Sequence, residues 1–467
     1  MKHILACWLF CLCVIILAGC RSYEGEFVQK SEAELEQMES LSLTAQKNFS
    51  SGELHLAEKI IKNLSKDKTV SQPLYQLEHL SVLLLGNRHD EAHKLMEGLR
   101  RDLELLFDKD AADKAVSVWH GEVNKVYKGD AYERATFYAF MALSFIRKGN
   151  YEDAVRCVKN GLLADADSNK EGAVEDYALL YYLGFFASKK MGRNDEALEY
   201  LRGMNSALQL QGCKDQKLLE SRTQKYMALF DRVNPNVILV VWTGTPPTIL
   251  RHGSYKEIRS VIHGQTPFDA MALSVGSGAY VPFVGNAGNI DYQATTRGGR
   301  LMDNVLADKA AAKTAMEVSG NIFLVAGYAC LQVGAQTLST LPVGVSFLGA
   351  GLGCFIIGGA CHIVGSCMNP AADGRYWKNL PGQLYLIPMN LPAGKHKLML
   401  AGFKNSDRAG STLFNIEVPE KQGVSVIHLP MMQQGLDYGT IFVNRFNAER
   451  EAVASKAASQ RMSKEIK

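Results

Sequence analysis

A strong excess of either charge is absent from this chain of 467 residues, in which 51 Lys and Arg stand against 48 Asp and Glu. The near balance gives no reason to predict a nucleic-acid partner, which a clear excess of basic residues would indicate. Catalytic signatures are missing as well, since the sequence contains neither a Gly-x-Ser-x-Gly elbow nor a His-Glu-x-x-His helix. We therefore predict that the protein is not an enzyme, and a cell-wall-modifying enzyme stays open only as a further alternative.

Two stretches resemble ligand-binding motifs, and each lacks a necessary part. The segment Gly349–Gly353 has the glycine spacing of a nucleotide-binding loop, but it lies inside an apolar run without the strand, helix and acidic residue that such a site needs. Cys361, His362 and Cys367 offer sulfur and nitrogen ligands, yet their spacing matches no common zinc pattern. We expect no cofactor and no metal site.

The first twenty residues have the organisation of a bacterial lipoprotein signal. An apolar run from Ile4 to Leu17 leads to the small pair Ala18-Gly19 and then to Cys20. This pattern predicts that residues 1–19 are a signal peptide and that Cys20 carries acyl chains which hold the protein to a membrane. Because Arg21 and not aspartate follows the cysteine, we expect the periplasmic side of the outer membrane. A non-lipidated signal peptide or an N-terminal anchor helix is the alternative.

A polar tether at residues 20–39 precedes a region, residues 40–232, whose apolar residues recur at three- and four-residue spacing. Within it a glycine is followed five or six residues later by an alanine, at Gly52/Ala57, Gly86/Ala92, Gly149/Ala154 and Gly192/Ala197. The glycine suits a turn between two helices, and the alanine lets the helices pack closely. At the third copy the chain resembles a tetratricopeptide repeat (TPR).

The repeats predict an α-solenoid of TPR-like helix pairs with a concave face, and an unrelated helical bundle is the alternative. Such a face commonly holds a segment of a partner protein. The candidate partner-binding residues are Tyr138, Phe145, Tyr181 and Tyr182. Most of these aromatic side chains are expected in the core between repeats.

From residue 236 the pattern changes to short apolar runs separated by glycine, proline and asparagine, which predicts an α+β domain with an antiparallel sheet or sandwich. Its two parts cover residues 236–300 and 373–444, with a helical insertion at 301–372 between them and a charged tail at 445–467. The runs expected to form strands are Val237–Trp242, Ile258–Ile262, Met271–Val275, Ile290–Ala294, Leu384–Ile387, Lys395–Leu400, Thr412–Val418, Val424–Leu429 and Thr440–Val443.

No Asp, Glu, Lys or Arg occurs in the insertion from Val318 to Ala372. The run divides at Ser339–Pro342, which predicts a hairpin of two apolar helices, each about long enough to span a membrane. Gly349 and Gly353 predict a helix face that is open to a close neighbour. Trp377 is a candidate anchor at the membrane surface, and the alternative is that its loop packs on the sheet. The hairpin itself lies either in lipid or buried in protein.

Three further stretches carry a resemblance that covers nearly the whole chain: Lys128–Arg134, Asn236–Gly244 and Asp373–Pro381, the last of which is followed by Leu391–Leu398. The chain resembles a family of bacterial lipoproteins that join a TPR-like region to a C-terminal β domain. The resemblance implies an envelope scaffold without catalytic residues. We therefore expect a non-enzymatic, lipid-anchored adaptor that binds an envelope protein through its TPR-like groove. A structural or pore-like membrane component that uses the 318–372 hairpin is the alternative.

Overall fold

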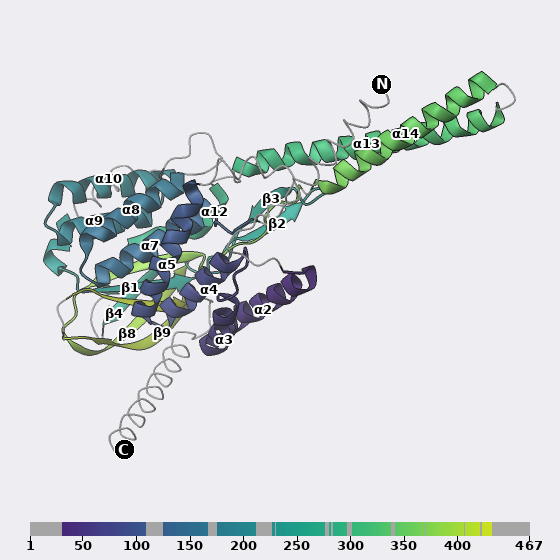
Figure 1. Ribbon diagram of the computed structural model, residues 1–467. Coiled ribbons are helices and arrows are strands. Elements are labelled where there is room, and N and C mark those ends of the chain that lie inside the picture. The colour runs from purple at the N-terminus through teal and green to yellow at the C-terminus, as the bar shows by residue number, and fades with distance from the viewer. Residues whose placement is uncertain are drawn as a thin grey trace, which may run out of the picture.

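The computed structural model describes residues 30–108, 125–166, 175–211 and 227–431, apart from short gaps at 229, 276–279, 282–283, 297–300, 338–340, 369, 406 and 421–422. The predicted signal peptide, Cys20, the strand expected at Thr440–Val443 and the charged tail lie outside the described residues. The described chain forms a body of helices and sheets, from which a long helical hairpin points away (Figure 1).

Four helix pairs make up the first part of the body. They are α2 (Glu32–Ser50) with α3 (Leu54–Leu64), α4 (Gln72–Leu85) with α5 (His89–Asp108), α7 (Ala131–Arg147) with α8 (Tyr151–Ala166), and α9 (Ala178–Lys190) with α10 (Asn194–Leu210). Gly52, Gly149 and Gly192 have positive φ in the turns, a conformation that glycine adopts without a steric penalty. The alanines at 57, 92, 154 and 197 are all fully buried. The predicted TPR-like helix pairs are confirmed.

The helical domain begins earlier than the sequence pattern indicated. Helix α2 starts at Glu32, inside the predicted tether of residues 20–39. Ser31 and Glu34 form a capping box, in which the Ser31 hydroxyl accepts from the Glu34 backbone and the Glu34 carboxylate accepts from the Ser31 backbone. These bonds satisfy backbone N–H groups that a helix start leaves without partners.

The two helices of a pair differ in burial. In α4, α7 and α9 nearly every residue is buried, so these helices are covered on all sides. Helices α8 and α10 bury one face and expose the other. An apolar helix that is covered all round needs a second layer of protein against it, and that layer is a β-sheet.

Two four-stranded sheets and a two-stranded ribbon form the β part of the body. The first sheet has the order β10-β1-β7-β6, with β10 (Ser425–Met431), β1 (Val237–Thr243), β7 (Gln383–Met389) and β6 (Val284–Asn289). The second has the order β5-β4-β8-β9, with β5 (Tyr280–Val281), β4 (Ala270–Val275), β8 (Gly394–Lys404) and β9 (Asp407–Val418). The ribbon pairs β2 (Thr248–His252) with β3 (Ile258–Ile262). Strand β1 runs antiparallel to β7 but parallel to β10, so the first sheet is mixed.

Strand β1 lies at the centre of a three-layer arrangement. Its even-numbered residues Ile238, Val240 and Trp242 join the helical core, whereas Val237, Leu239 and Val241 join a second core between the two sheets. Side chains alternate between the faces of a strand, so a strand that is apolar at every position fits between two layers. The layers are therefore helices, first sheet and second sheet, as Figure 1 shows.

One predicted strand is wrong. Residues Ile290–Ala294 were expected to be extended, but they lie in the short helix α12 (Ile290–Thr296). The Asn289 side chain accepts a hydrogen bond from the Tyr292 backbone and so caps the helix start. The strand at this point is β6, which directly precedes the helix. A local capping interaction thus overrides the β-like composition of the segment.

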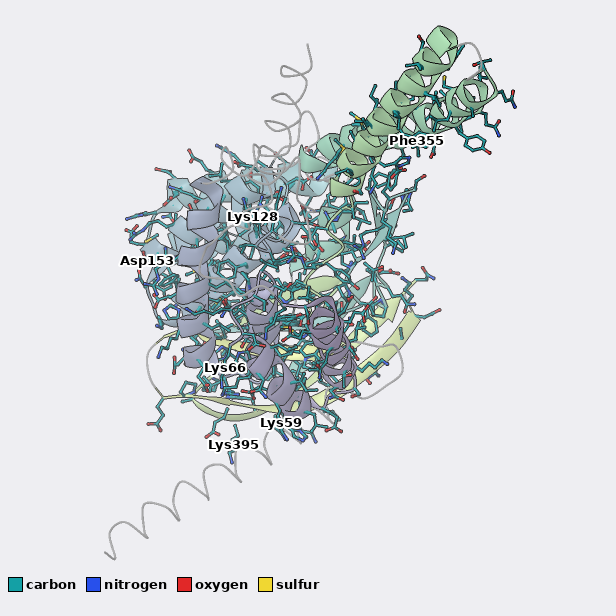
Figure 2. The ribbon with its side chains drawn as sticks, turned by 45° about the vertical axis from the view of Figure 1, so that its right-hand side comes forward. Lys59, Lys66, Lys128, Asp153, Phe355 and Lys395 are labelled. Carbon is teal, nitrogen blue, oxygen red and sulfur yellow. The ribbon has the colours of Figure 1, made fainter. Side chains whose placement is uncertain are left out.

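The predicted apolar insertion forms two long helices, α13 (Leu301–Gln336) and α14 (Leu341–Cys367). The predicted break is confirmed, because α13 ends before Ser339 and Pro342 lies in the first turn of α14, where proline is tolerated. Helix α13 begins well before the charge-free run, and the two helices pack along each other outside the body (Figures 1 and 2).

Candidate functional site

The face of the helix pairs that would form the TPR-like groove is covered by the protein's own first sheet. Phe140 of α7 stacks on Trp242 of β1, with ring centroids 5.3 Å apart and planes 4° from parallel. The Trp242 indole donates to His428 Nδ1 of β10 at 2.9 Å. Burial lowers the pKa of His428 well below its usual value, so this imidazole is neutral and able to accept. The helices and the sheet therefore share one core.

A side chain from the helical domain also closes the edge of this sheet. Asn87, in the turn between α4 and α5, donates to the His428 carbonyl oxygen at 3.2 Å and accepts from the His428 backbone at 2.9 Å. Strand β10 is an edge strand, whose free backbone groups would otherwise offer a pairing site. The amide of Asn87 takes the place of a neighbouring strand at this point.

The four predicted partner-binding residues do not line an open groove. Tyr138, Phe145 and Tyr182 are 3%, 9% and 2% exposed and belong to the helical core. Tyr181 is partly exposed, and its hydroxyl donates to the Glu175 carboxylate at 3.3 Å. Three of the four are therefore core residues between helices, as was expected for most of these aromatic side chains, and they are not exposed to a partner.

The segment that follows α14 ties the helical domain to the sheet. The Arg375 guanidinium donates to both carboxylate oxygens of Asp373 at 2.9 Å, and to the carbonyl oxygens of Lys125 at 2.8 Å and Val70 at 3.3 Å. It also lies over the Tyr127 ring, 5.5 Å from the centroid. A planar fork with five donors suits such a set of acceptors, which a lysine cannot satisfy in the same way. The segment is a structural clamp between the two parts of the body.

Glu133 of α7 is the buried acid of this clamp. Its carboxylate accepts from the Tyr127 hydroxyl and the Asp130 backbone, each at 2.6 Å, and from the Trp377 backbone at 2.5 Å. Burial raises the pKa of Glu133 to about 7, and the nearby Asp130 carboxylate acts in the same direction, whereas the hydrogen bonds oppose both. Asp130 is paired with the buried guanidinium of Arg259 from β3. These contacts hold α7 against both the 373–381 segment and the ribbon.

Trp377, a candidate for a membrane-surface anchor, is instead fully buried. Its indole donates to the Ser81 hydroxyl of α4 at 2.9 Å, and its ring meets Phe140 edge-on. The alternative reading, a loop that packs on the body, therefore describes this residue.

Glycines form the contact between the two arms of the hairpin. A Cβ atom on Gly327 would lie 3.1 Å from the Gly351 carbonyl oxygen, and one on Gly351 would lie 2.9 Å from the Gly327 carbonyl oxygen. Gly320, Gly334 and Gly358 are equally tight, since each would meet an atom of the opposite arm within 3 Å. The arms are thus closer together than any larger side chain would permit.

Gly349 and Gly353 lie on the other side of α14. A Cβ atom on either glycine would have no atom within 4 Å among the described residues. The two predicted packing glycines therefore face outward, and the glycines that join the arms were missed. The signal for the latter was a seven-residue spacing, which the sequence shows at Gly320, Gly327 and Gly334 and again at Gly351, Gly358 and Gly365.

The outer faces of the hairpin expose large apolar side chains. In the most apolar 18-residue window of Lys309–Gln336 only 17% of the residues are buried, and in that of Val345–Ile363 only 11%. The most exposed side chains include Val325 at 71%, Ile322 at 62%, Leu352 at 59% and Ile356 at 58%. By length and composition each of the two helices could cross a membrane. They are not core helices of this chain.

Polar and aromatic residues gather where the hairpin joins the body. Lys313 donates to the Met368 carbonyl oxygen at 3.0 Å, and its ammonium lies 4.8 Å from the Tyr255 ring centroid. The Tyr255 hydroxyl donates to the Glu317 carboxylate at 2.6 Å, and this hydrogen bond raises the pKa of Tyr255. Tyr255 lies in the turn of the β2–β3 ribbon, so the ribbon supports the base of the hairpin.

Metal-ligating clusters and small cavities are the remaining candidate features of the described residues. No group of three or more His, Cys, Asp and Glu side chains is gathered there as metal ligands. His362 packs against Gly320 in the contact between the arms. A small hollow lined by Leu84, His89, Phe140 and His428, among others, has room for about one water and not for an organic ligand.

Comparison with solved structures finds proteins that are similar to part of the chain. No family model and no curated protein matches the chain. A solved structure of nearly identical TPR-like repeats, described as a kinesin light chain from Podosopora anserina, is similar to 42% of this chain and to 97% of its own length. The identity is 14% and the TM-score is 0.27. A TM-score of this size carries no argument about function. The evidence for the TPR-like fold is the set of helix pairs described above.

Proposed function

We propose that this protein is a non-enzymatic, membrane-attached scaffold of the bacterial envelope. The α13–α14 hairpin inserts into the hydrocarbon core of a membrane, and the TPR-like body stays outside and binds partner proteins. The observation that carries the proposal is the hairpin itself, a pair of apolar helices that leaves the body and exposes its large side chains.

Apolar side chains that are exposed to water forgo the free energy that their burial would contribute. Full burial of an aliphatic side chain contributes about 1.5–3 kcal/mol. Eight aliphatic residues of the hairpin are each roughly half or more exposed, namely Val318, Ile322, Val325, Val345, Leu352, Ile356, Ile357 and Ile363. Covering them would contribute on the order of 7–14 kcal/mol in total. Lipid supplies that cover without any change in the hairpin.

The dimensions and charges of the hairpin fit a bilayer. From Val318 to Gln336 a helix rises about 27 Å, close to the hydrocarbon thickness of about 30 Å. Glu317 is the last charged residue before the apolar run, and it lies at the base with Lys313 and Tyr255. Charged and aromatic residues are expected at this level, where headgroups and water meet. Both ends of the hairpin return to the body, so the body lies on one side of the membrane.

A second attachment is proposed at the N-terminus. The signal pattern that ends at Cys20 supports lipidation at this residue, on the periplasmic side of the outer membrane. Because the sheet covers the TPR-like groove, the binding of envelope proteins is proposed for the outer surface of the body. The exposed face of α8, which includes Leu163 at 69% exposure, belongs to this surface.

A photoreactive lipid tests hairpin insertion in the full chain. Membranes that contain the protein are loaded with a phospholipid that carries a diazirine in its acyl chain, irradiated, and digested with trypsin. The sequence has no Lys or Arg between Lys313 and Arg375, so the whole apolar hairpin is released as the peptide Thr314–Arg375. We expect lipid adducts in this peptide at least tenfold above those in the peptide of residues 160–170, which carries the exposed Leu163.

Substitution with aspartate provides the matched control. In α13 and α14, Val325→Asp with Ile356→Asp adds about 2.5–3.5 kcal/mol per residue to insertion and should remove the adducts. Leu163→Asp, at an equally exposed position on α8, should leave them unchanged. Adducts that are spread evenly over body and hairpin, or that persist in the double variant, would refute insertion.

A further inference from the structure

One side of α13 differs from the rest of the hairpin surface. Asn321, Val325, Tyr328, Gln332 and Gln336 follow one another at spacings of four, three, four and four residues, so they share one helical face. All five are exposed, Tyr328 at 60%. The Gln332 amide donates to the Tyr328 hydroxyl at 3.0 Å. We call these five residues the polar stripe.

The side chains that the structure describes on the outward face of α14 form no such stripe. The large exposed side chains of α14 include Val345, Leu352, Ile356 and Ile363, which share a face by their spacing. The hairpin therefore has a side that suits acyl chains and a side that carries amides and a phenol. Among the residues that the structure describes, no side chain of the same molecule hydrogen-bonds the amides of Asn321 and Gln336, and both face outward.

Inside a membrane these amides need a partner. Polar side chains of membrane helices generally face other helices or a water-filled space, because hydrocarbon offers them no hydrogen bond. The stripe carries no charge, so it cannot form an ion pair with a charged partner. An amide both donates and accepts, which makes a row of amides complementary to an identical row.

We propose that the polar stripe is a self-association surface, through which the hairpins of two copies of this chain pack in the membrane. The inference rests on the proposed insertion of the hairpin. Both copies insert from the same side, so their α13 helices run parallel about a two-fold axis along the hairpin. In that symmetry each stripe position meets its own counterpart in the second copy. The apolar face of α14 is then left for lipid.

Cysteine cross-linking of the full chain tests the geometry. In a background in which Cys157, Cys213, Cys330, Cys354, Cys361 and Cys367 are alanine, one cysteine is introduced at a time and the membranes are oxidised. Val325→Cys lies inside the stripe but leaves all four polar side chains in place. Leu352→Cys is the control, since Gly351 faces Gly327 and thus sets residue 352 at nearly the same depth as residue 325. We expect a disulfide-linked dimer for Val325→Cys and none for Leu352→Cys.

A second variant separates association from insertion. Asn321→Leu with Gln332→Leu makes the hairpin more apolar, so insertion should persist or improve. The Val325→Cys cross-link should nevertheless fall at least threefold, because interhelical hydrogen bonds of this kind change association by about 3- to 15-fold each. Lipid photolabelling of the peptide Thr314–Arg375 is measured in the same membranes.

The outcomes are distinct. Loss of photolabelling in the unsubstituted hairpin would overturn insertion, and this inference with it. Normal photolabelling with equal cross-linking at residues 325 and 352, or with none at either, would overturn self-association through the stripe alone. Reaction of Val325→Cys with a water-soluble maleimide in intact membranes, without a cross-link, would also overturn it and would indicate a stripe that faces water.

Discussion

Two glycines of α14 are only two residues apart but differ in their surroundings. Replacing each of them by alanine is therefore expected to change the stability of the hairpin in different ways. Gly351 faces α13, where an added Cβ would lie 2.8 Å from Leu331 Cγ and 2.9 Å from the Gly327 carbonyl oxygen. Gly349 faces outward, and an added Cβ there would meet no described atom within 4 Å. The pair of variants is Gly351→Ala and Gly349→Ala.

The magnitudes follow from two terms. Replacing glycine by alanine inside a helix contributes about 0.5–1 kcal/mol of stability, and both variants gain this. A methyl group forced into a well-packed contact costs about 1–3 kcal/mol, and only Gly351→Ala meets this cost. The backbone oxygen of Gly327 cannot rotate away as a side chain can, so the arms must separate. The difference between the two variants is therefore about 1–3 kcal/mol, with Gly351→Ala the less stable.

Hydrogen–deuterium exchange of the full chain in detergent micelles measures this difference. Local opening free energies translate into exchange rates, so α14 should exchange about 5- to 150-fold faster in Gly351→Ala than in Gly349→Ala. Exchange in α7 should be equal in the two variants, because α7 lies in the core of the body. Equal exchange of α14 in both variants would show that the close contact between the arms is not what holds the hairpin together.

Three predictions concern the body. Arg375→Lys should lower the free energy of unfolding by about 2–3 kcal/mol in urea titrations, because a compact ammonium does not match the four acceptors that the planar guanidinium reaches, both Asp373 oxygens and two carbonyl oxygens. Trp377→Phe should cost about 1–3 kcal/mol in the same titrations through the lost bond to Ser81 and the smaller ring, while Ser81→Ala isolates the bond. Burial raises the pKa of Glu78 to about 7, so its folded form holds a proton that the unfolded chain releases near pH 4.5. Stability from Glu78 should therefore fall by up to about 3 kcal/mol between pH 4.5 and 7, and Glu78→Gln should remove that slope from urea midpoints.

Local signals in the sequence predicted the elements that depend on local chemistry. The glycine–alanine pairs located the turns of the helix pairs. In three of the four turns the glycine itself is left-handed, and in the turn after α4 the next residue, Asn87, has that conformation instead, while the alanine is buried in every pair. Likewise, proline at 342 and the run without charge located the two arms of the hairpin. The helix at Ile290 was missed because its start depends on one capping side chain, Asn289, and on a contact with a distant residue, Gly382, whose carbonyl oxygen accepts from the Ile290 and Asp291 backbones.

The glycines of the hairpin show how a correct pattern can be assigned to the wrong contact. Gly349 and Gly353 are four residues apart, which is a spacing seen where membrane helices pack. The contact between the arms uses the seven-residue spacing of Gly320, Gly327 and Gly334 instead, as expected for two helices that wind around each other. Both patterns are present in the sequence, and only the position of the second arm distinguishes them.

The closure of the TPR-like groove depends on contacts between residues far apart in the chain, yet part of it could be deduced. Val237–Trp242 is apolar at six successive positions, which indicates a strand covered on both faces. The second sheet covers one face of β1, so the other face must find a second apolar surface of similar size. Helices α4, α7 and α9, apolar nearly all round, present a surface with the same need. Two such surfaces in one chain can bury each other. When repeats predict a binding groove, the rest of the sequence should therefore be searched for an apolar strand that would cover it.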